Sequence, residues 1–124
     1  MGKIIIGIML SLFILTNLNA DWSSYKTLVI YNKGVTLYYK YNHKKNCTDI
    51  KFKAENKSAS RVWPSVVNKV YTCKDGSRES GSDESVGSTN LKPFKSSSTQ
   101  PDYCRCKNKG GLSNVRATLE VRKL

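Results

Sequence analysis

The 124-residue sequence is poor in histidine, in acidic residues and in helical patterning. Its one histidine, His43, lies in a polar and basic turn, where a solvent-exposed side chain is expected. A serine or cysteine nucleophile activated by histidine would need this residue, so no catalytic site is predicted. After residue 20, no stretch repeats apolar residues with helical spacing, and no segment is apolar enough to enter a membrane. These absences disfavour an enzyme and a helical fold.

A metal or cofactor signature is also missing. Structural zinc sites usually carry paired C-x-x-C motifs, whereas the four cysteines here are separated by 25, 30 and 1 intervening residues. Four acidic residues gather in the segment 74–90, which is rich in serine and glycine. A calcium site needs several oxygen ligands in a fixed geometry, so this segment is interpreted as a flexible surface loop. We therefore expect no metal and no cofactor.

The first twenty residues have the pattern of a cleavable signal peptide. Lys3 supplies the positive charge, residues 4–15 form an apolar run, and Ala20 ends a short polar exit. The run is too short to span a bilayer as a helix, which needs about 20 residues. Cleavage would leave a single domain, residues 21–124, without a transmembrane segment; the alternative is an uncleaved N-terminal anchor. The sequence thus predicts a secreted or periplasmic protein.

All four cysteines, Cys47, Cys73, Cys104 and Cys106, follow this leader. An even number in a short exported chain predicts two disulfides. Cys104 and Cys106 are two residues apart, so a bond between them would be strained, and on a strand both would point to one face. We therefore predict that Cys47 and Cys73 each bond to the 104–106 segment.

Alternation of apolar and polar residues dominates the rest of the chain. The clearest strand is 114–123, with Val115 and Leu119 on one face and Arg116 on the other. Further strands are predicted at 25–31, 35–41, 48–54 and 66–73. Six or seven short strands in about 100 residues predict an all-β fold, an antiparallel β-sandwich, with a small closed barrel as the alternative.

Three short motifs carry a family resemblance: residues 71–76 (YTCKDG), residues 91–93 (LKP), and residues 104–106 (CRC) with the glycine-rich stretch that follows. Over roughly residues 28–122, the chain resembles small exported bacterial β-sandwich proteins. The resemblance implies an immunoglobulin-like sandwich and implies no activity.

An excess of positive charge is the most informative feature. Loss of Lys3 with the leader lowers the Lys and Arg count from 21 to 20 against 9 acidic residues, a net charge of about +11. Lysines on the 48–54 strand alternate with core residues, so we expect them on one outward face, which would attract polyanions. The predicted polyanion-binding residues are Lys44, Lys45, Lys51, Lys53, Arg105, Lys107 and Lys109.

Together these features predict an exported, non-enzymatic binding module. Its basic face would meet an anionic glycan, a lipid surface or an extracellular protein, with no specific nucleic acid as partner. Tyr38 is expected to face outward, with Tyr39 and Tyr41 in the core. The alternatives are a secreted effector or inhibitor that binds a host or competitor protein, and a charge that serves solubility alone.

Overall fold

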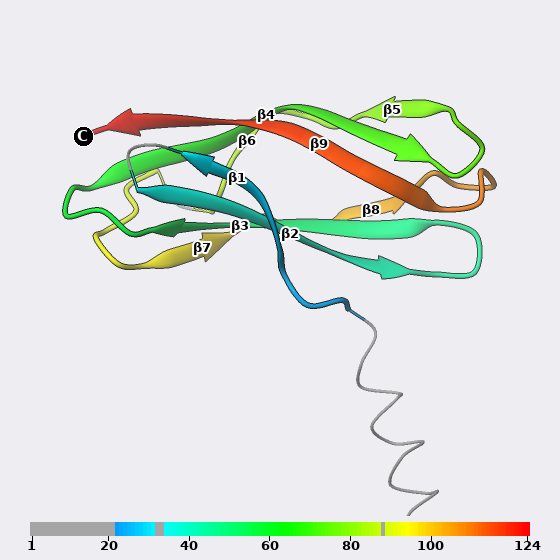
Figure 1. Cartoon of the computed structure of the whole chain (residues 1–124), viewed down its shortest axis with the longest axis horizontal. Helices are drawn as coiled ribbons and strands as arrows, with labels where there is room; N and C mark the ends of the chain where they lie inside the picture. The colour runs from blue at the N-terminus through cyan, green and yellow to red at the C-terminus, as the bar shows by residue number, and fades with distance from the viewer. Residues whose placement is uncertain (1–21, 32–33, 88) are drawn as a thin grey trace, which may run out of the picture.

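The computed structural model describes residues 22–31, 34–87 and 89–124. The predicted signal peptide, residues 1–20, and its cleavage site lie outside the described residues. Figure 1 shows the strands arranged in two stacked layers. Among the described residues, no helix has the length and hydropathy that a bilayer crossing requires.

The first sheet begins with a meander of three antiparallel strands. β1 (Lys26–Tyr31) pairs with β2 (Val35–His43), and β2 pairs with β3 (Thr48–Asn56). Two short strands, β7 (Ser96–Ser98) and β8 (Asp102–Arg105), pair with the other side of β3. β3 is therefore an inner strand, and its outward side chains have neighbours on both sides.

The second sheet is built around β4 (Val62–Cys73). β9 (Leu112–Lys123) pairs with one side of β4, while β5 (Arg78–Ser80) and β6 (Glu84–Ser85) pair with the other. The strands in the described part of the chain thus form two separate antiparallel sheets, and the alternative of a closed barrel is wrong.

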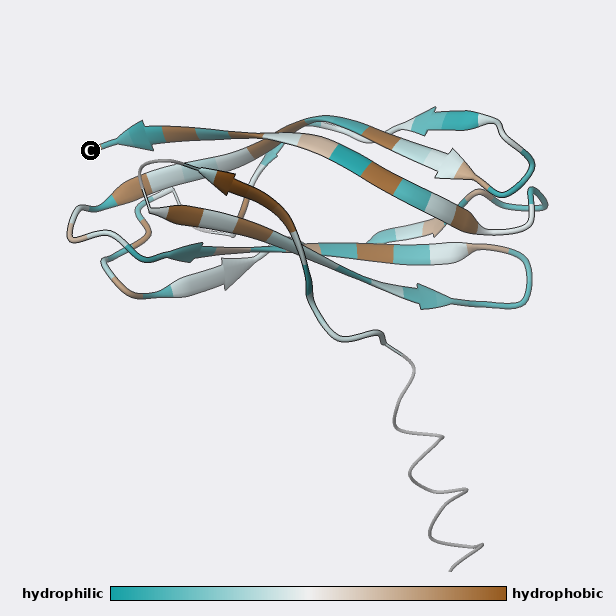
Figure 2. Cartoon of the chain, in the orientation of Figure 1, coloured by the Kyte–Doolittle hydropathy of each residue, from teal (hydrophilic) through white to brown (hydrophobic). Residues whose placement is uncertain are grey.

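Side chains of both sheets alternate between core and solvent. In β3, Ile50, Phe52 and Ala54 are all fully buried. In β9, Val115 and Leu119 are buried, and Figure 2 shows hydrophobic and hydrophilic residues alternating along this strand. Burial of the facing apolar side chains is the main force that stacks the two sheets. The prediction of an all-β fold with two packed antiparallel sheets is confirmed.

A bulge in β4 changes which residues face the core. The pairing with β9 shifts between Val67 and Val70, where Asn68 has a φ of 52°. Buried residues have even numbers at the start of β4 and odd numbers after the bulge, where Lys69 and Tyr71 are buried. One extra residue in the strand therefore turns Lys69 inward, although simple alternation would place it outward.

Two disulfides hold one end of the sandwich. Cys47, just before β3, bonds to Cys104 in β8, within the first sheet. Cys73, at the end of β4, bonds to Cys106, just after β8, and so joins the two sheets. The sequence separations are 57 and 33 residues. In the chain-entropy model each bond is worth about 4 kcal/mol. The predicted pairing of Cys47 and Cys73 with the 104–106 segment is confirmed.

The segment 74–90 contains structure that the sequence did not predict. β5 and β6 lie within it and pair with β4. Val86 is fully buried, and its backbone N–H donates to the Pro64 carbonyl at 2.9 Å. The segment therefore contributes two strands and one core residue, while its flexibility stays a prediction. Backbone pairing with β4 and one buried valine hold a stretch whose composition is otherwise polar.

Candidate polyanion-binding surface

The seven cationic residues predicted to bind a polyanion lie in three places: on β3, in the turn between β2 and β3, and in and after β8. In that order they are Lys51 and Lys53, Lys44 and Lys45, and Arg105, Lys107 and Lys109. The three groups differ in whether an acidic side chain lies beside them. A cation without an acidic partner is available to pair with a ligand.

The face of the first sheet that points away from the second carries lysines without acidic partners. Lys40 of β2 lies directly opposite Lys51 of β3, and Tyr38 lies opposite Lys53. Like charges in directly opposed positions repel each other. Among residues 22–31, 34–87 and 89–124, no carboxylate forms an ion pair with these three lysines. Their positive charge is therefore not balanced by the described part of the protein.

Aromatic rings lie among these lysines. The Tyr25 ring contacts two ammonium groups: Lys40 Nζ is 4.8 Å and Lys53 Nζ is 4.2 Å from its centroid. Lys53 Nζ also lies 5.0 Å from the Tyr38 centroid, and Lys40 Nζ lies 5.2 Å from that of Trp22. Such cation–π contacts position an ammonium group without neutralising it. We term this group the outer lysine face: Trp22, Tyr25, Tyr38, Lys40, Lys51 and Lys53.

Sequence reasoning found Tyr38, Lys51 and Lys53 of this face but missed Lys40. The signal was present, because Lys40 alternates with Tyr39 and Tyr41, which pack against the core and are partly buried. The contribution of Tyr25 had no such signal, since it depends on how the chain before β1 lies against β2. The Ser23 backbone N–H holds that segment in place by donating a hydrogen bond to the Tyr41 carbonyl at 2.8 Å.

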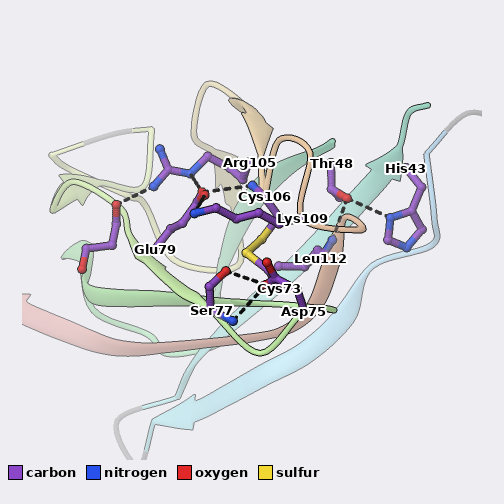
Figure 3. The surroundings of a disulfide bond; sticks show 11 residues. His43, Thr48, Cys73, Asp75, Ser77, Glu79, Arg105, Cys106, Lys109 and Leu112 are labelled. Carbon is purple, nitrogen blue, oxygen red and sulfur yellow. Dashed lines mark hydrogen bonds and ion pairs between the residues drawn. A yellow bond between two sulfur atoms is a disulfide. The ribbon is translucent and has the colours of Figure 1, made fainter. Parts of the chain in front are cut away.

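Arg105 and Lys109, in contrast, share the carboxylate of Glu79 on β5 as an ion-pair partner. Figure 3 shows this carboxylate between the two cations, beside the Cys73–Cys106 disulfide. It lies 3.6 Å from Arg105 Nε and 3.3 Å from Lys109 Nζ, and it accepts a hydrogen bond from the Cys106 backbone N–H at 3.0 Å. The Cys106 bond above all, with the two cations, holds the pKa of Glu79 below its usual value. The two cations thus link β5 to the end of β8 and to the turn that follows it.

The turn between β2 and β3 combines a balanced and an unbalanced lysine. Lys44 Nζ lies 2.8 Å from Asp49 Oδ2, and Asp49 is almost fully buried. The other oxygen of Asp49 accepts a hydrogen bond from the Cys104 backbone N–H at 2.9 Å. Lys45 is exposed and forms no ion pair with a described residue, and the same is true of Lys107.

A buried ion-pair cluster, which the sequence did not reveal, connects the two sheets. The Lys69 side chain is fully buried, its Nζ forms an ion pair with Glu84, and it lies 3.3 Å from Asp102 Oδ2. The same Asp102 accepts a hydrogen bond from the Tyr71 hydroxyl, and Lys69 Nζ lies 5.1 Å from the Phe52 centroid. Burial and then the bond to Asp102 raise the pKa of Tyr71. The bulge in β4 brings Lys69 to this position, and no pattern in the sequence predicted the bulge.

His43 is the last residue of β2 and is exposed, as predicted. Its Nδ1 lies 2.9 Å from Thr48 Oγ1, which accepts a hydrogen bond from the Leu112 backbone N–H at 3.0 Å (Figure 3). Burial, and then the positive charge of Lys74, lower the pKa of His43. Both effects favour the neutral imidazole.

One group of possible metal ligands occurs among the described residues: Cys73, Glu79 and Cys106. The two sulfur atoms are joined in a disulfide, and the carboxylate already pairs with two cations. Metal binding by cysteine needs a thiolate, so this group is a structural cluster.

Comparison of the chain with protein-family models, with curated proteins and with solved structures finds no match. The candidate site is therefore defined by the structure alone. In this small disulfide-bonded β protein, some cations have acidic partners among the described residues and others have none.

Proposed function

We propose that the protein is an exported, non-enzymatic binding module that holds polyanions on the outer lysine face. The observation that carries the proposal is the direct opposition of Lys40 and Lys51, beside Lys53, with no described carboxylate to balance them. Sulfate, phosphate or carboxylate groups of a ligand would supply the missing negative charge and relieve the repulsion. The class of ligand is an anionic glycan or an anionic lipid surface.

The tyrosines of this face support a repeating anionic ligand. Their rings hold the Lys40 and Lys53 ammonium groups in place, so less conformational entropy is lost when a ligand binds. The rings also offer flat surfaces that can contact sugar rings between the charged groups. Lysines that served solubility alone would need neither the contacts with the tyrosine rings nor the flat ring surfaces beside them.

Export is part of the same proposal. Two disulfides that close long loops are typical of proteins in an oxidising compartment, which supports a secreted or periplasmic location. The immunoglobulin-like class of sandwich and the similarity to small exported bacterial proteins stay predictions, supported by two stacked antiparallel sheets and the disulfides.

The proposal is tested by titrating the protein with heparin and with anionic lipid vesicles at about 0.02 M salt, where the Debye length is longest, and again at about 0.15 M. We expect measurable binding that weakens steeply with salt, and weaker binding by Lys51→Ser/Lys53→Ser at an unchanged unfolding temperature. Dextran, an uncharged polysaccharide, is the control. If neither heparin nor anionic vesicles bind at low salt, the charge serves solubility and the proposal fails.

A further inference from the structure

A second cationic site lies at the end of the sandwich where β2 turns into β3 and β9 begins. A cavity of about 410 Å³ opens there, lined by Lys44 and Lys45 of the turn, Lys74 after β4, His43, and the backbone at Gly110 and Gly111. We term it the lysine cavity. Its residues are separate from those of the outer lysine face.

The charge in this cavity is of one sign. None of the described residues that line it is a carboxylate. Lys44 is paired with Asp49, but Lys45 and Lys74 are exposed and form no ion pair within the described ranges. An anion in the cavity would therefore meet two lysines whose charges have no other partner.

The turn before β9 adds backbone donors to the lysines. Asn108, Gly110 and Gly111 have φ values of 58°, 84° and 83°. A turn that contains left-handed residues can present several backbone N–H groups to one side, an arrangement that binds anions. The N–H groups of Gly110 and Gly111 donate to no acceptor among the described residues, whereas that of Asn108 donates to the Asn46 carbonyl at 2.8 Å.

The positive φ favours glycine at positions 110 and 111, and the space for a side chain there is tight. A Cβ at Gly110 would lie 3.0 Å from the Lys74 Cβ, and one at Gly111 would lie 3.2 Å from Thr48 Oγ1. The close approach brings the backbone of the turn against Lys74 and His43, so the donors and the cations line the same cavity.

An aromatic groove adjoins the lysine cavity through His43, which lines both. The groove has a volume of about 260 Å³ and is lined by Tyr39, Tyr41, Lys26 and the first residues of β9. The Tyr41 and His43 ring centroids are 4.7 Å apart at an interplanar angle of 47°, and Lys26 Nζ lies 5.8 Å from the Tyr41 centroid. The groove thus offers ring surfaces beside a further cation, and its described lining contains no carboxylate.

We propose that the groove and the lysine cavity form one binding site for an acidic saccharide. The sugar ring lies on Tyr41 and His43, and its carboxylate or sulfate group enters the cavity between Lys45 and Lys74. Ser113 and Asn114 in the groove supply polar groups for the sugar hydroxyls. The inclined rings do not form a parallel slot for a flat nucleobase, which favours a saccharide over a nucleotide. This site goes beyond the proposed function, because it uses other residues and takes a short ligand.

His43, the only histidine, gives a direct measurement of this site by NMR. The probes are a heparin-derived disaccharide, inorganic sulfate, glucose and uridine monophosphate, added to the full chain while the imidazole signals are followed. The charged or titratable groups that line the two hollows with His43 are Tyr39, Tyr41, Lys26, Lys44, Lys45 and Lys74. None of these groups is a carboxylate. A bound anion would therefore add negative charge beside His43 and should raise its pKa.

We expect the disaccharide to shift the His43 signals saturably and to raise its pKa. Sulfate should bind at least about tenfold more weakly, because it lacks the sugar ring. Glucose should hardly bind at all, because it lacks the anionic group. Equal affinity for sulfate and disaccharide, tighter binding of uridine monophosphate, or unchanged His43 signals would each overturn the proposal.

Three variants complete the test. Lys74→Ser should weaken disaccharide binding about tenfold, the effect of one charge-assisted hydrogen bond. Lys107, an exposed lysine of the turn before β9, lines neither hollow, so Lys107→Ser should leave the affinity unchanged. Lys40→Ser/Lys51→Ser should weaken heparin binding at the outer face without changing the His43 titration, so that the two proposals succeed or fail separately. A Lys107 variant that loses as much affinity as the Lys74 variant would contradict the site.

Discussion

Two groups of cationic side chains in this protein differ in what surrounds them. Lys69, Arg105 and Lys109 each contact a carboxylate, and they connect strands that are far apart in the sequence. Lys40 and Lys51 face each other across two neighbouring strands and contact no carboxylate in the described part of the chain. The same residue type is thus used in two different environments.

The difference shows that the acidic residues, although few, decide where the positive charge is available. Glu79, Glu84 and Asp102 lie between or beside the two sheets, and each contacts at least one cation. Along β3, the acidic residues nearest to Lys51 and Lys53 are Asp49 and Glu55. Asp49 is occupied by Lys44 and the Cys104 backbone N–H, and Glu55 is occupied by Tyr38 and Lys57. We infer that paired cations stabilise the fold and that unpaired cations are left for a ligand.

The largest expected effect distinguishes the two groups by stability. Lys69→Met removes the cation between Glu84 and Asp102, and we expect a loss of about 3 kcal/mol in the free energy of unfolding, because a partly buried carboxylate pair is left unbalanced. Lys40→Met on the outer lysine face should change it by no more than about 0.5 kcal/mol. Urea unfolding of both variants makes the measurement, and equal losses would remove the distinction.

A smaller effect concerns Glu79 and its dependence on pH. Glu79→Gln keeps the side-chain shape but loses the charge that faces Arg105 and Lys109, so we expect a loss of about 1 kcal/mol at neutral pH. The pKa of Glu79 lies below its usual value of 4.5, so its stabilisation is present above that pH and is lost as the pH falls through the lowered pKa. The difference between wild type and variant should therefore shrink in acid.

The matched control for this prediction is Glu120→Gln. Glu120 is exposed on β9 and forms no ion pair with a described residue, so its replacement should leave stability unchanged at every pH. A stability difference for Glu79→Gln that stays constant down to about pH 2, below both pKa values, would mean that shape and not charge explains the effect.

Much of this fold could be predicted from periodicity and cysteine spacing. Alternation placed Ile50 and Phe52 inward and Lys51 and Lys53 outward, because a strand without a bulge has a fixed period of two. The pairing of Cys47 and Cys73 with the 104–106 segment followed from the strain that would oppose a bond between Cys104 and Cys106, but the individual partners did not.

The remaining features depend on long-range contacts that a local pattern does not carry. The bulge at Asn68 changed the period, so Lys69 became a buried cation. Glu79 sits in a polar stretch, and only the fold brings it against Arg105 and Lys109. The predicted polyanion set therefore combined residues with and without acidic partners, which only the tertiary structure separates.

The most direct test compares two double variants that remove the same charge. Lys40→Ser/Lys51→Ser removes two unpaired lysines, and Lys57→Ser/Lys109→Ser removes two lysines that pair with Glu55 and Glu79 at 3.5 and 3.3 Å. The measurement is heparin affinity over a range of salt concentrations, for both variants and the wild type. We predict that the first variant loses affinity about tenfold, since two charge contacts disappear, and that the second loses about twofold or less. Equal losses in the two variants would contradict the central claim, because binding would then follow net charge and not the absence of acidic partners.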